Sequence, residues 1–465
     1  MLKSRFILII IICAASLTFD LTVFNAHHRT PPAGAEFKDI FRFHYYSGDG
    51  CFFNAHALRW MDLLGVMRFK SQDYGLEFSQ YFKTPSYRVA PGYPFLIGIT
   101  YKIFGLGNYR ALILGQMILK SLTALLIFMI FTLIGAKFGF YLTDISGLVS
   151  AILYATWLPA SIYVHYYPFY SETMAVFFIV LTTYLVLSAI ANKNHWRWLC
   201  AGLSCGIVVL TRESWLLFPF FLLLGMLFYN YTFKKISYIR FMIFILAAVL
   251  SVAPLTIYNF HKYGKFIPVA SSAFGWSQWA DYGKSRYGVG FNAASLAKKE
   301  ETDTIQKIGE SAYNVDYQRQ LLFKAMSLYA AHPVAFLRGQ LQYYHRLWIY
   351  GSPPPLDLPV VSRKFGNSSC IPASVAILLS LPFLILATAG IACCWKKWQI
   401  YPLLFSPLLY VLIVNMFFHF EFRYSLPAWP FIFLACGFAW NKLLRKLWSR
   451  ISHQAKNNNT ACDNF

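Results

Sequence analysis

Ten apolar stretches separated by polar turns constrain the fold of this chain more than any other feature of its sequence. Most of them approach the ~20 residues that a helix needs to cross the hydrocarbon core of a bilayer. Inside lipid every backbone N–H and C=O group needs a partner within the protein, so such stretches can span only as helices. The sequence therefore predicts an all-α polytopic membrane protein. Its ten predicted spans are 6–24, 112–134, 144–164, 173–191, 198–211, 214–231, 239–259, 371–394, 401–418 and 424–441.

The charged residues support this class and predict the orientation of the spans. They make up 13% of the 465 residues, whereas about 25% is usual in soluble proteins. The net charge is +22, and the basic residues gather in alternate turns, as they do in cytoplasmic loops. With the N-terminus inside, the short outer turns hold only Arg212 and Arg423. Topology therefore accounts for the positive charge, and we expect no nucleic-acid partner.

This orientation divides the chain into a transmembrane domain, 1–442, and a basic cytoplasmic tail, 443–465, whose polar end we predict to be disordered. Two long segments, 25–110 and 260–370, fall outside the cytoplasm. Both carry apolar residues at helical spacing, which predicts amphipathic helices lying on the membrane surface. These predicted helices cover about 53–64, 91–105, 313–331 and 333–348.

Six polar or aromatic motifs follow one another on the predicted outer side of the membrane. A lone carboxylate between glycines, Asp49, comes first, and glycines beside it allow another molecule to approach closely. Each motif alone is a weak signal, but six in this order on one side are hard to obtain by chance. The motifs are Ser47–Gly50, Arg88–Leu96, Tyr167–Glu172, Leu210–Glu213, Tyr258–Trp276 and Phe420–Pro430.

This ordered set resembles the glycosyltransferase C superfamily, and within it the protein O-mannosyltransferases and the lipid A aminoarabinose transferases. The resemblance covers about residues 1–442 and implies a GT-C-like helix bundle in the inner, plasma membrane. It implies transfer of a sugar from a polyprenyl-monophosphate carrier to an acceptor at the extracytoplasmic face. Single displacement with inversion at the anomeric carbon would follow. Lipid A, a protein or a glycan remain open as the acceptor.

Asp49 occupies the place of the family's carboxylate in the first outer segment, which acts on the acceptor. A hydroxyl acceptor loses a proton as it attacks, and the resemblance implies that Asp49 takes this proton as general base. The ordinary alternative is a loop aspartate that makes an Asx-turn. The mannosyltransferase branch has a second acid directly after this position, where this chain has Gly50. That departure puts protein mannosylation in doubt.

Two arginines are candidates for the donor phosphate. Arg88 lies where the aminoarabinose transferases carry a basic residue that contacts the phosphate, and Arg423 begins the last span. A guanidinium group can bind phosphate oxygens bidentately and stabilise the leaving phosphate. The alternatives are an interfacial contact of Arg88 with lipid headgroups and an ion pair between Arg423 and Glu421.

Four further residues are predicted to orient substrates: Glu172, Glu421, Tyr93 and Trp276. Glu172 stands at the head of the fourth span and can either orient the acceptor or pair with Arg212. Trp276 can stack on the sugar or anchor the protein at the interface. We predict no metal site, because no two outer histidines have ligand spacing and no carboxylates cluster beside Asp49. No cofactor is expected besides the donor lipid itself.

Two other functions remain open at this stage. A transporter or flippase of lipid-linked sugars would usually show internal repeats and charges at mid-membrane; no repeat is visible, and Lys120 is the clearest such charge. A non-catalytic subunit of a cell-envelope complex would not need the ordered motifs. Cys51 and Cys370 fall in the two outer segments and are either buried free thiols or a disulfide.

Overall fold

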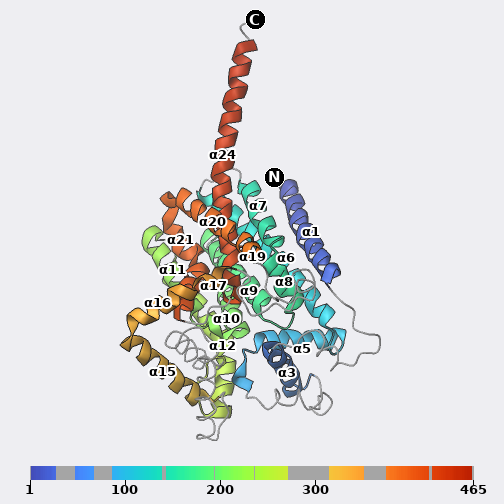
Figure 1. Ribbon diagram of the computed structural model, residues 1–465, viewed down its shortest axis with the longest axis vertical. Helices are drawn as coiled ribbons and strands as arrows, with labels where there is room; N and C mark the ends of the chain where they lie inside the picture. Colours follow the sequence, from blue (N-terminus) through green and yellow to red (C-terminus); the bar gives the residue numbers. More distant parts are fainter. Residues whose placement is uncertain are drawn as a thin grey trace.

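The computed structural model describes residues 2–27, 48–66, 86–138, 143–192, 194–234, 236–270, 314–349, 373–417 and 422–462. All regular elements in these ranges are helices (Figure 1). They are α1 (Leu2–His27), α3 (Gly48–Leu63), η2 (Ser86–Arg88), α5 (Gly92–Phe104), α6 (Tyr109–Phe138), α7 (Thr143–Ala155), α8 (Leu158–Tyr166), α9 (Glu172–Asn192), α10 (His195–Thr211), η3 (Glu213–Trp215), α11 (Phe218–Phe233), α12 (Tyr238–Tyr263), α15 (Val315–Ala331), α16 (Pro333–Tyr343), α17 (His345–Trp348), α19 (Ala373–Leu378), α20 (Leu381–Cys393), η4 (Trp395–Ile400), α21 (Tyr401–Leu404), α22 (Ser406–Val414), η5 (Asn415–Phe417), α23 (Phe422–Ser425), η6 (Leu426–Ala428) and α24 (Trp429–Cys462).

The protein is an all-α polytopic membrane protein, as the sequence predicts. Five described helices are long and apolar enough to cross a bilayer, and a bent pair makes up to six. The five are Arg5–Phe24, Tyr109–Gly135, Glu172–Asn192, Glu213–Phe233 and Tyr238–Tyr263. The other predicted spans contain further helices, shown in Figure 1, and the ten-span arrangement stays a prediction.

Among the predicted spans that are divided into several helices, three show the same cause. The span 144–164 consists of α7 and α8, which meet at 45°. The span 371–394 consists of α19 and α20, and 401–418 consists of α21, α22 and η5. In each case a proline stands at the start of the helix that follows the break. Proline has no N–H to continue the preceding helix, but it suits the first turn of a new one.

The core lies where α6, α7, α9 and α24 pack together, with α10 and α20 beside them (Figure 1). Two glycines allow the closest approaches. A Cβ on Gly390 of α20 would lie 1.9 Å from the backbone oxygen of Ala435 on α24. One on Gly202 of α10 would lie 2.4 Å from the oxygen of Phe244 on α12. Small residues at such crossings are typical of helix packing in membranes.

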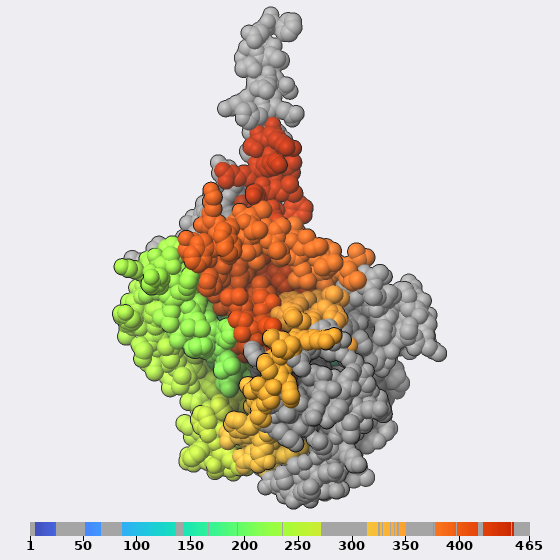
Figure 2. Space-filling model, turned by 60° about the vertical axis from the view of Figure 1, so that its left-hand side comes forward, coloured from blue at the N-terminus to red at the C-terminus, as the bar shows by residue number. Residues whose placement is uncertain are grey.

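The described helices that follow the first and seventh spans, among them α3, α5 and α15, lie at one end of the bundle and form an outer layer (Figure 1). The interfacial helices predicted over 53–64 and 91–105 are present as α3 and α5, which pack on each other. Those predicted over 313–331 and 333–348 are present as α15 and α16 followed by α17. Figure 2 shows α15 and α16 lying along the surface between α12 and the C-terminal helices.

The end of α12 holds this outer layer in place. The rings of Tyr87 in η2 and Tyr263 stack edge to face at 4.7 Å. The backbone N–H of Ser86 donates to the Tyr263 hydroxyl at 3.2 Å. On the other side, Lys265 forms a 2.6 Å ion pair with Asp316 of α15. The η2 turn and α15 therefore dock on the same helix end.

The C-terminal tail corrects one expectation. We predicted disorder from about residue 453, but α24 continues as one helix to Cys462 and projects from the bundle (Figure 1). Residues 453–462 include Gln454, Ala455, Lys456 and Ala461, which favour helices, but also three asparagines and a threonine, which do not. The stretch therefore continues a helix that the membrane part has already nucleated, and does so despite its mixed intrinsic propensity.

Candidate functional site

Asp49 is the second residue of α3, which begins at Gly48. The sequence predicted a helix that follows this aspartate, and the structure includes Asp49 in its first turn. The side chain of Asp49 lies outside the described part of the structure. Phe52 is three residues further on and therefore lies on the same helix face. The guanidinium carbon of Arg88 stands 4.9 Å from the centre of the Phe52 ring. Arg88 is thus next to the turn that carries Asp49.

Arg88 is also close in the chain to a tight contact with α10. Ala90 is buried in a cluster with Val209. A Cβ on Gly92 would stand 2.8 Å from the backbone oxygen of Leu210, so only glycine fits this approach without a shift. The segment that starts at Arg88 therefore lies against the last turn of α10, directly before Arg212.

Arg212 forms a buried ion pair with Glu172. Its Nη1 lies 2.7 Å from Oε1 of Glu172, and both side chains are almost fully enclosed. Glu172 begins α9, where a negative charge is favourable because of the helix dipole. The pairing of Glu172 with Arg212, one of two possibilities raised by the sequence, is confirmed. A role of Glu172 in orienting substrate stays a prediction.

Arg423 joins this pair through a shared aromatic ring. The guanidinium carbons of Arg212 and Arg423 lie 4.9 and 5.1 Å from the centre of the Tyr424 ring. Arg423 also stands 5.6 Å from the ring of Tyr170, two residues before Glu172. Cation–π contacts of this kind hold a guanidinium in place without neutralising it. The two guanidinium groups therefore meet at one aromatic ring, beside the carboxylate of Glu172.

Sequence reasoning missed Arg212 as a member of a cationic site. Burial lowers the pKa of Arg212, Glu172 and Tyr424 raise it, and the neighbouring Arg423 lowers it. The net result is a pKa above its ordinary value, so the charge is permanent. The available signal was the arginine in Leu210–Glu213, at the outer end of a span, where a charge is a functional suspect.

Tyr93 of α5 lies in the buried interface between α5 and α6. It is completely buried, and its hydroxyl donates to the backbone oxygen of Pro168. Gln116 of α6 donates to the same hydroxyl at 2.6 Å. Tyr93 therefore connects α5 to the segment that leads into Glu172. Its predicted role in orienting substrate stays a prediction.

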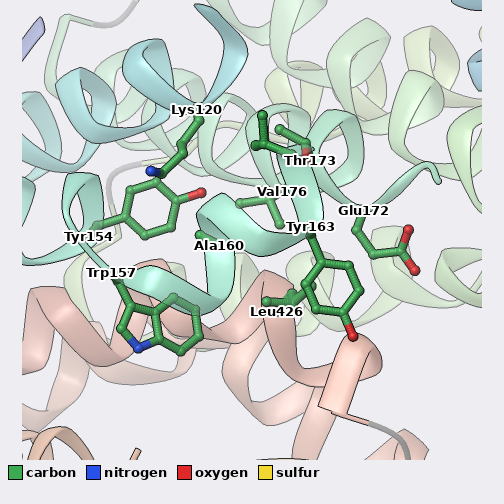
Figure 3. Close-up of a pocket in the computed structure, with 10 residues that line it drawn as sticks. Lys120, Tyr154, Trp157, Ala160, Tyr163, Glu172, Thr173, Val176 and Leu426 are labelled. Atoms are coloured by element: carbon green, nitrogen blue, oxygen red, sulfur yellow. The ribbon is translucent and has the colours of Figure 1, made fainter. Parts of the chain in front are cut away.

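A cavity runs inward from Glu172 toward Lys120, with aromatic walls (Figure 3). In Figure 3 the carboxylate of Glu172 points away from Lys120; Tyr154 lies beside Lys120, Tyr163 lies beside Glu172, and Val176 lies between the two ends. It is lined by Lys120, Tyr154, Trp157, Ala160, Tyr163, Val164, Glu172, Thr173, Val176 and Leu426.

Several predicted site features fall on residues that the structure does not describe. Glu421, Trp276 and Cys370 are among them, as is the side chain of Cys51. The predicted roles of Glu421 and Trp276 and the possible disulfide therefore stay predictions. Within the described ranges no group of three His, Cys, Asp or Glu residues could hold a metal ion.

His56 on α3 gives the outer site a testable pH dependence. Burial, followed by the charges of Arg59 and Arg88, lowers the pKa of His56 from 6.5 to about 3. Between pH 6.5 and about pH 3, His56 binds a proton in the unfolded chain but stays neutral in the folded protein. The free energy of unfolding therefore falls as the pH drops through this range. At pH 5 the loss is about 2 kcal/mol. We expect His56→Gln to lose less thermal stability than wild type between pH 8 and pH 5, measured in detergent. Equal losses in both proteins would contradict this.

A family model of dolichyl-phosphate-mannose-protein mannosyltransferases matches residues 88–258. This region runs from Arg88 through Glu172 and Arg212 to the last turns of α12. No curated protein sequence matches the chain.

Solved structures of an archaeal oligosaccharyltransferase from Archaeoglobus fulgidus have a similar fold. The structure of AglB with an inhibitory peptide and a dolichol-phosphate is 14% identical, with a TM-score of 0.53, covering 96% of this chain and 51% of that one. The apo form gives the same identity and coverage, with a TM-score of 0.52. The form tethered to an acceptor peptide with an NVT sequon is 14% identical, with a TM-score of 0.51. That match covers 93% of this chain and 49% of the archaeal one. The chain thus spans about half the length of these structures.

These findings confirm the resemblance to the glycosyltransferase C superfamily and the GT-C type of fold. At 14% identity the solved structures show a similar fold and nothing about the activity of this chain.

Proposed function

We propose that this chain is an integral membrane glycosyltransferase that moves a sugar from a polyprenyl-monophosphate carrier to an extracytoplasmic acceptor. The observation that carries the proposal is the pair Arg212 and Arg423 on the Tyr424 ring. With Arg88 beside the turn of Asp49, permanent cations and a potential base come from neighbouring segments. Arginine is the side chain best suited to binding phosphate oxygens through two parallel hydrogen bonds.

In this proposal Asp49 accepts the proton of the acceptor hydroxyl while the hydroxyl oxygen attacks the anomeric carbon. The bond between that carbon and the phosphate oxygen breaks, and its electron pair leaves with the polyprenyl phosphate. Attack from the opposite side inverts the anomeric configuration. Arg88, Arg212 and Arg423 stabilise the negative charge on the leaving phosphate, and Glu172 holds Arg212 in place. Gly50 disfavours mannose transfer to protein. The acceptor that fits the proposal is lipid A, a glycan, or a protein that receives a different sugar.

Two comparisons support a lipid-phosphate donor. The matching family is described by dolichyl-phosphate-mannose, and one structure of similar fold contains a dolichol-phosphate. We propose that the donor enters from the bilayer and the acceptor from outside, at the inner, plasma membrane. Basic residues of the outer layer would attract anionic lipid phosphates.

A flippase of lipid-linked sugars is a second candidate, favoured by one observation. Lys120 and Asp20 form a 2.8 Å ion pair that is wholly buried within membrane helices. Charges at such depth often mark transport pathways.

A transfer assay separates the transferase from the flippase. Purified protein and vesicles of the host membrane, as the source of acceptor, receive synthetic polyprenyl phosphates that carry a radiolabelled sugar. A transferase moves label into a new product, whereas a flippase leaves it on the polyprenyl carrier.

The proposed topology places the outer layer and the C-terminal tail on opposite sides of the membrane. Reporter fusions at positions 280 and 455 should therefore give opposite signals, with 280 outside and 455 inside, because the positive charges follow the cytoplasmic turns. Signals from the same side would overturn the ten-span arrangement.

Transfer activity should survive EDTA. A polyprenyl monophosphate carries less charge than a pyrophosphate, and the proposed site already supplies three guanidinium groups to it. The measurement compares transfer by purified protein before and after EDTA, followed by added Mg²⁺ or Mn²⁺. Strict dependence on the added metal would instead favour a site in which Asp49 is a metal ligand.

A further inference from the structure

Gln116 and Lys120 stand one turn apart on the same face of α6, and both side chains are completely buried. Neither is one of the residues proposed to contact the substrates. Together they bond to the bent segment 155–173, which comprises the end of α7, all of α8 and the start of α9. This segment ends at Glu172, the partner of Arg212. A polar face buried in a membrane helix is costly unless it is fully satisfied, so its partners indicate its purpose.

Lys120 bridges the break between α7 and α8. The carbonyl of Ala155 would receive its helical hydrogen bond from residue 159, but Pro159 has no N–H. The ammonium group of Lys120 donates to this carbonyl instead, at 2.8 Å. It also donates at 2.5 Å to the hydroxyl of Ser161, in the first turn of α8. One side chain of α6 therefore fastens both helices that meet at the bend.

Asp20 of α1 balances the buried charge. Its Oδ1 accepts from Lys120 at 2.8 Å and from the Ser161 hydroxyl at 2.7 Å. His165, near the end of α8, stands 3.6 Å from the same oxygen. An ammonium group has three donor hydrogens, and Asp20, Ala155 and Ser161 accept all three. Lys120 thus has no donor left for a substrate or a transported ion, which favours a role in holding the helices.

Gln116 fastens the other end of the segment. Its Nε2 donates at 2.5 Å to the backbone oxygen of Pro168, and its Oε1 accepts from the Thr173 hydroxyl at 2.9 Å. Glu172 lies between these two anchors, next to Thr173 in the chain. Figure 3 shows Lys120 and Thr173 approaching the cavity from different helices. The position of the Glu172 backbone is therefore set from α6.

We propose that Gln116 and Lys120 are positioning residues that hold the segment 155–173 so that Glu172 orients Arg212, and Tyr170 meets Arg423, at the donor phosphate. The identity of the ligand rests on the proposed function; the positioning itself does not. The proposal explains why a lysine is retained inside the membrane, where an apolar residue would otherwise be less costly.

The double variant Asp20→Asn, Lys120→Met separates positioning from folding. A single Lys120→Met change strands the Asp20 carboxylate in the membrane, and loss of one partner of a buried pair is strongly destabilising. The double variant removes both charges together, so it should insert and resist heat much like wild type. It still leaves the Ala155 carbonyl and Ser161 without the ammonium group. Ser121→Ala is the matched control, because Ser121 is buried beside Lys120 but bonds to Ser16 of α1 and not to the segment.

Two measurements are made on purified full-length protein. The first is the KM for a polyprenyl-phosphate sugar, with host membrane vesicles supplying the acceptor. In the double variant we expect the donor KM to rise by roughly tenfold or more with the acceptor KM unchanged, because a misplacement of about 1 Å can cost on the order of 10²-fold. The second is backbone hydrogen exchange of 167–173, which should become faster in the double variant and stay unchanged in Ser121→Ala.

A stable double variant with wild-type donor KM and wild-type exchange over 167–173 would overturn the proposal and leave the pair as a folding element alone. If wild type shows no transfer at all, the proposed function fails, and the hydrogen exchange still decides whether the segment is positioned from α6. Faster exchange with an unchanged donor KM would also contradict the proposal, since the segment would then be held for another purpose.

Discussion

Asp49→Asn is expected to reduce transfer by on the order of 10²–10⁴ while the protein still inserts in the membrane, because asparagine is nearly isosteric but cannot accept the acceptor's proton. The loss should appear in kcat, with a donor KM close to wild type, since the carboxylate would act on the acceptor and not on the phosphate. Initial rates at saturating donor measure this directly.

Asp62→Asn is the matched control for this change. Asp62 lies on the same helix, α3, near its end, and is exposed. The same substitution there removes an equal charge from the outer layer and should leave the rate within about twofold of wild type, as is usual for surface positions. Near wild-type activity of Asp49→Asn would remove Asp49 from the mechanism.

Arg423→Ala should be the second large loss, on the order of 10²–10³ in kcat/KM, because it removes a cation from the leaving phosphate. Arg423→Lys keeps the charge but not the planar fork, so we expect only partial recovery. Arg88→Ala and Arg88→Lys should behave in the same way. The measurement is kcat/KM for the donor in each of the four variants.

Arg110→Ala serves as the control for charge alone. Arg110 is exposed at the start of α6, on the same side of the bundle. If Arg423 acts only through the general attraction of anionic lipid, Arg110→Ala should match its loss and the losses should fade at high salt. If Arg423 binds the phosphate, Arg110→Ala should stay close to wild type while Arg88→Ala and Arg423→Ala are strongly impaired.

The membrane helices were predictable because their signal is local. A run of about 20 apolar residues can do little in lipid except form a helix, and the helices α6, α9 and α12 follow the predicted spans closely. The breaks in three spans were missed, although Pro159 and its counterparts mark them. A proline inside an apolar run is compatible with either a kink or the start of a new helix. Which of the two forms depends on packing against other helices, which the sequence does not show.

The candidate site was only partly predictable. Arg88, Glu172 and Arg423 were found from their place in ordered motifs. Arg212 was seen only as a possible partner of Glu172, because its contact with the Tyr424 ring joins segments that are far apart in the chain. The same holds for Lys120: the sequence indicates only a charge in mid-membrane, and its partners come from the distant helices α1 and α8.

The tail shows the reverse error. Its polar composition predicted disorder, but composition describes a segment in isolation. Trp429 and the residues after it are held in the bundle core, so the helix is already nucleated when it leaves the membrane, and each further turn adds to it at little cost.

The central claim is that a sugar leaves a polyprenyl monophosphate, and the donor headgroup tests it most directly. Purified protein is given matched synthetic donors that carry the same sugar and the same isoprenoid chain through one phosphate or through two, together with host membrane vesicles, and mass spectrometry identifies the released lipid. We predict that only the monophosphate donor is consumed, that polyprenyl monophosphate is released with one equivalent of transferred sugar of inverted configuration, and that Asp49→Asn releases little of it. Consumption of the pyrophosphate donor alone, or transfer with retained configuration, would contradict this account.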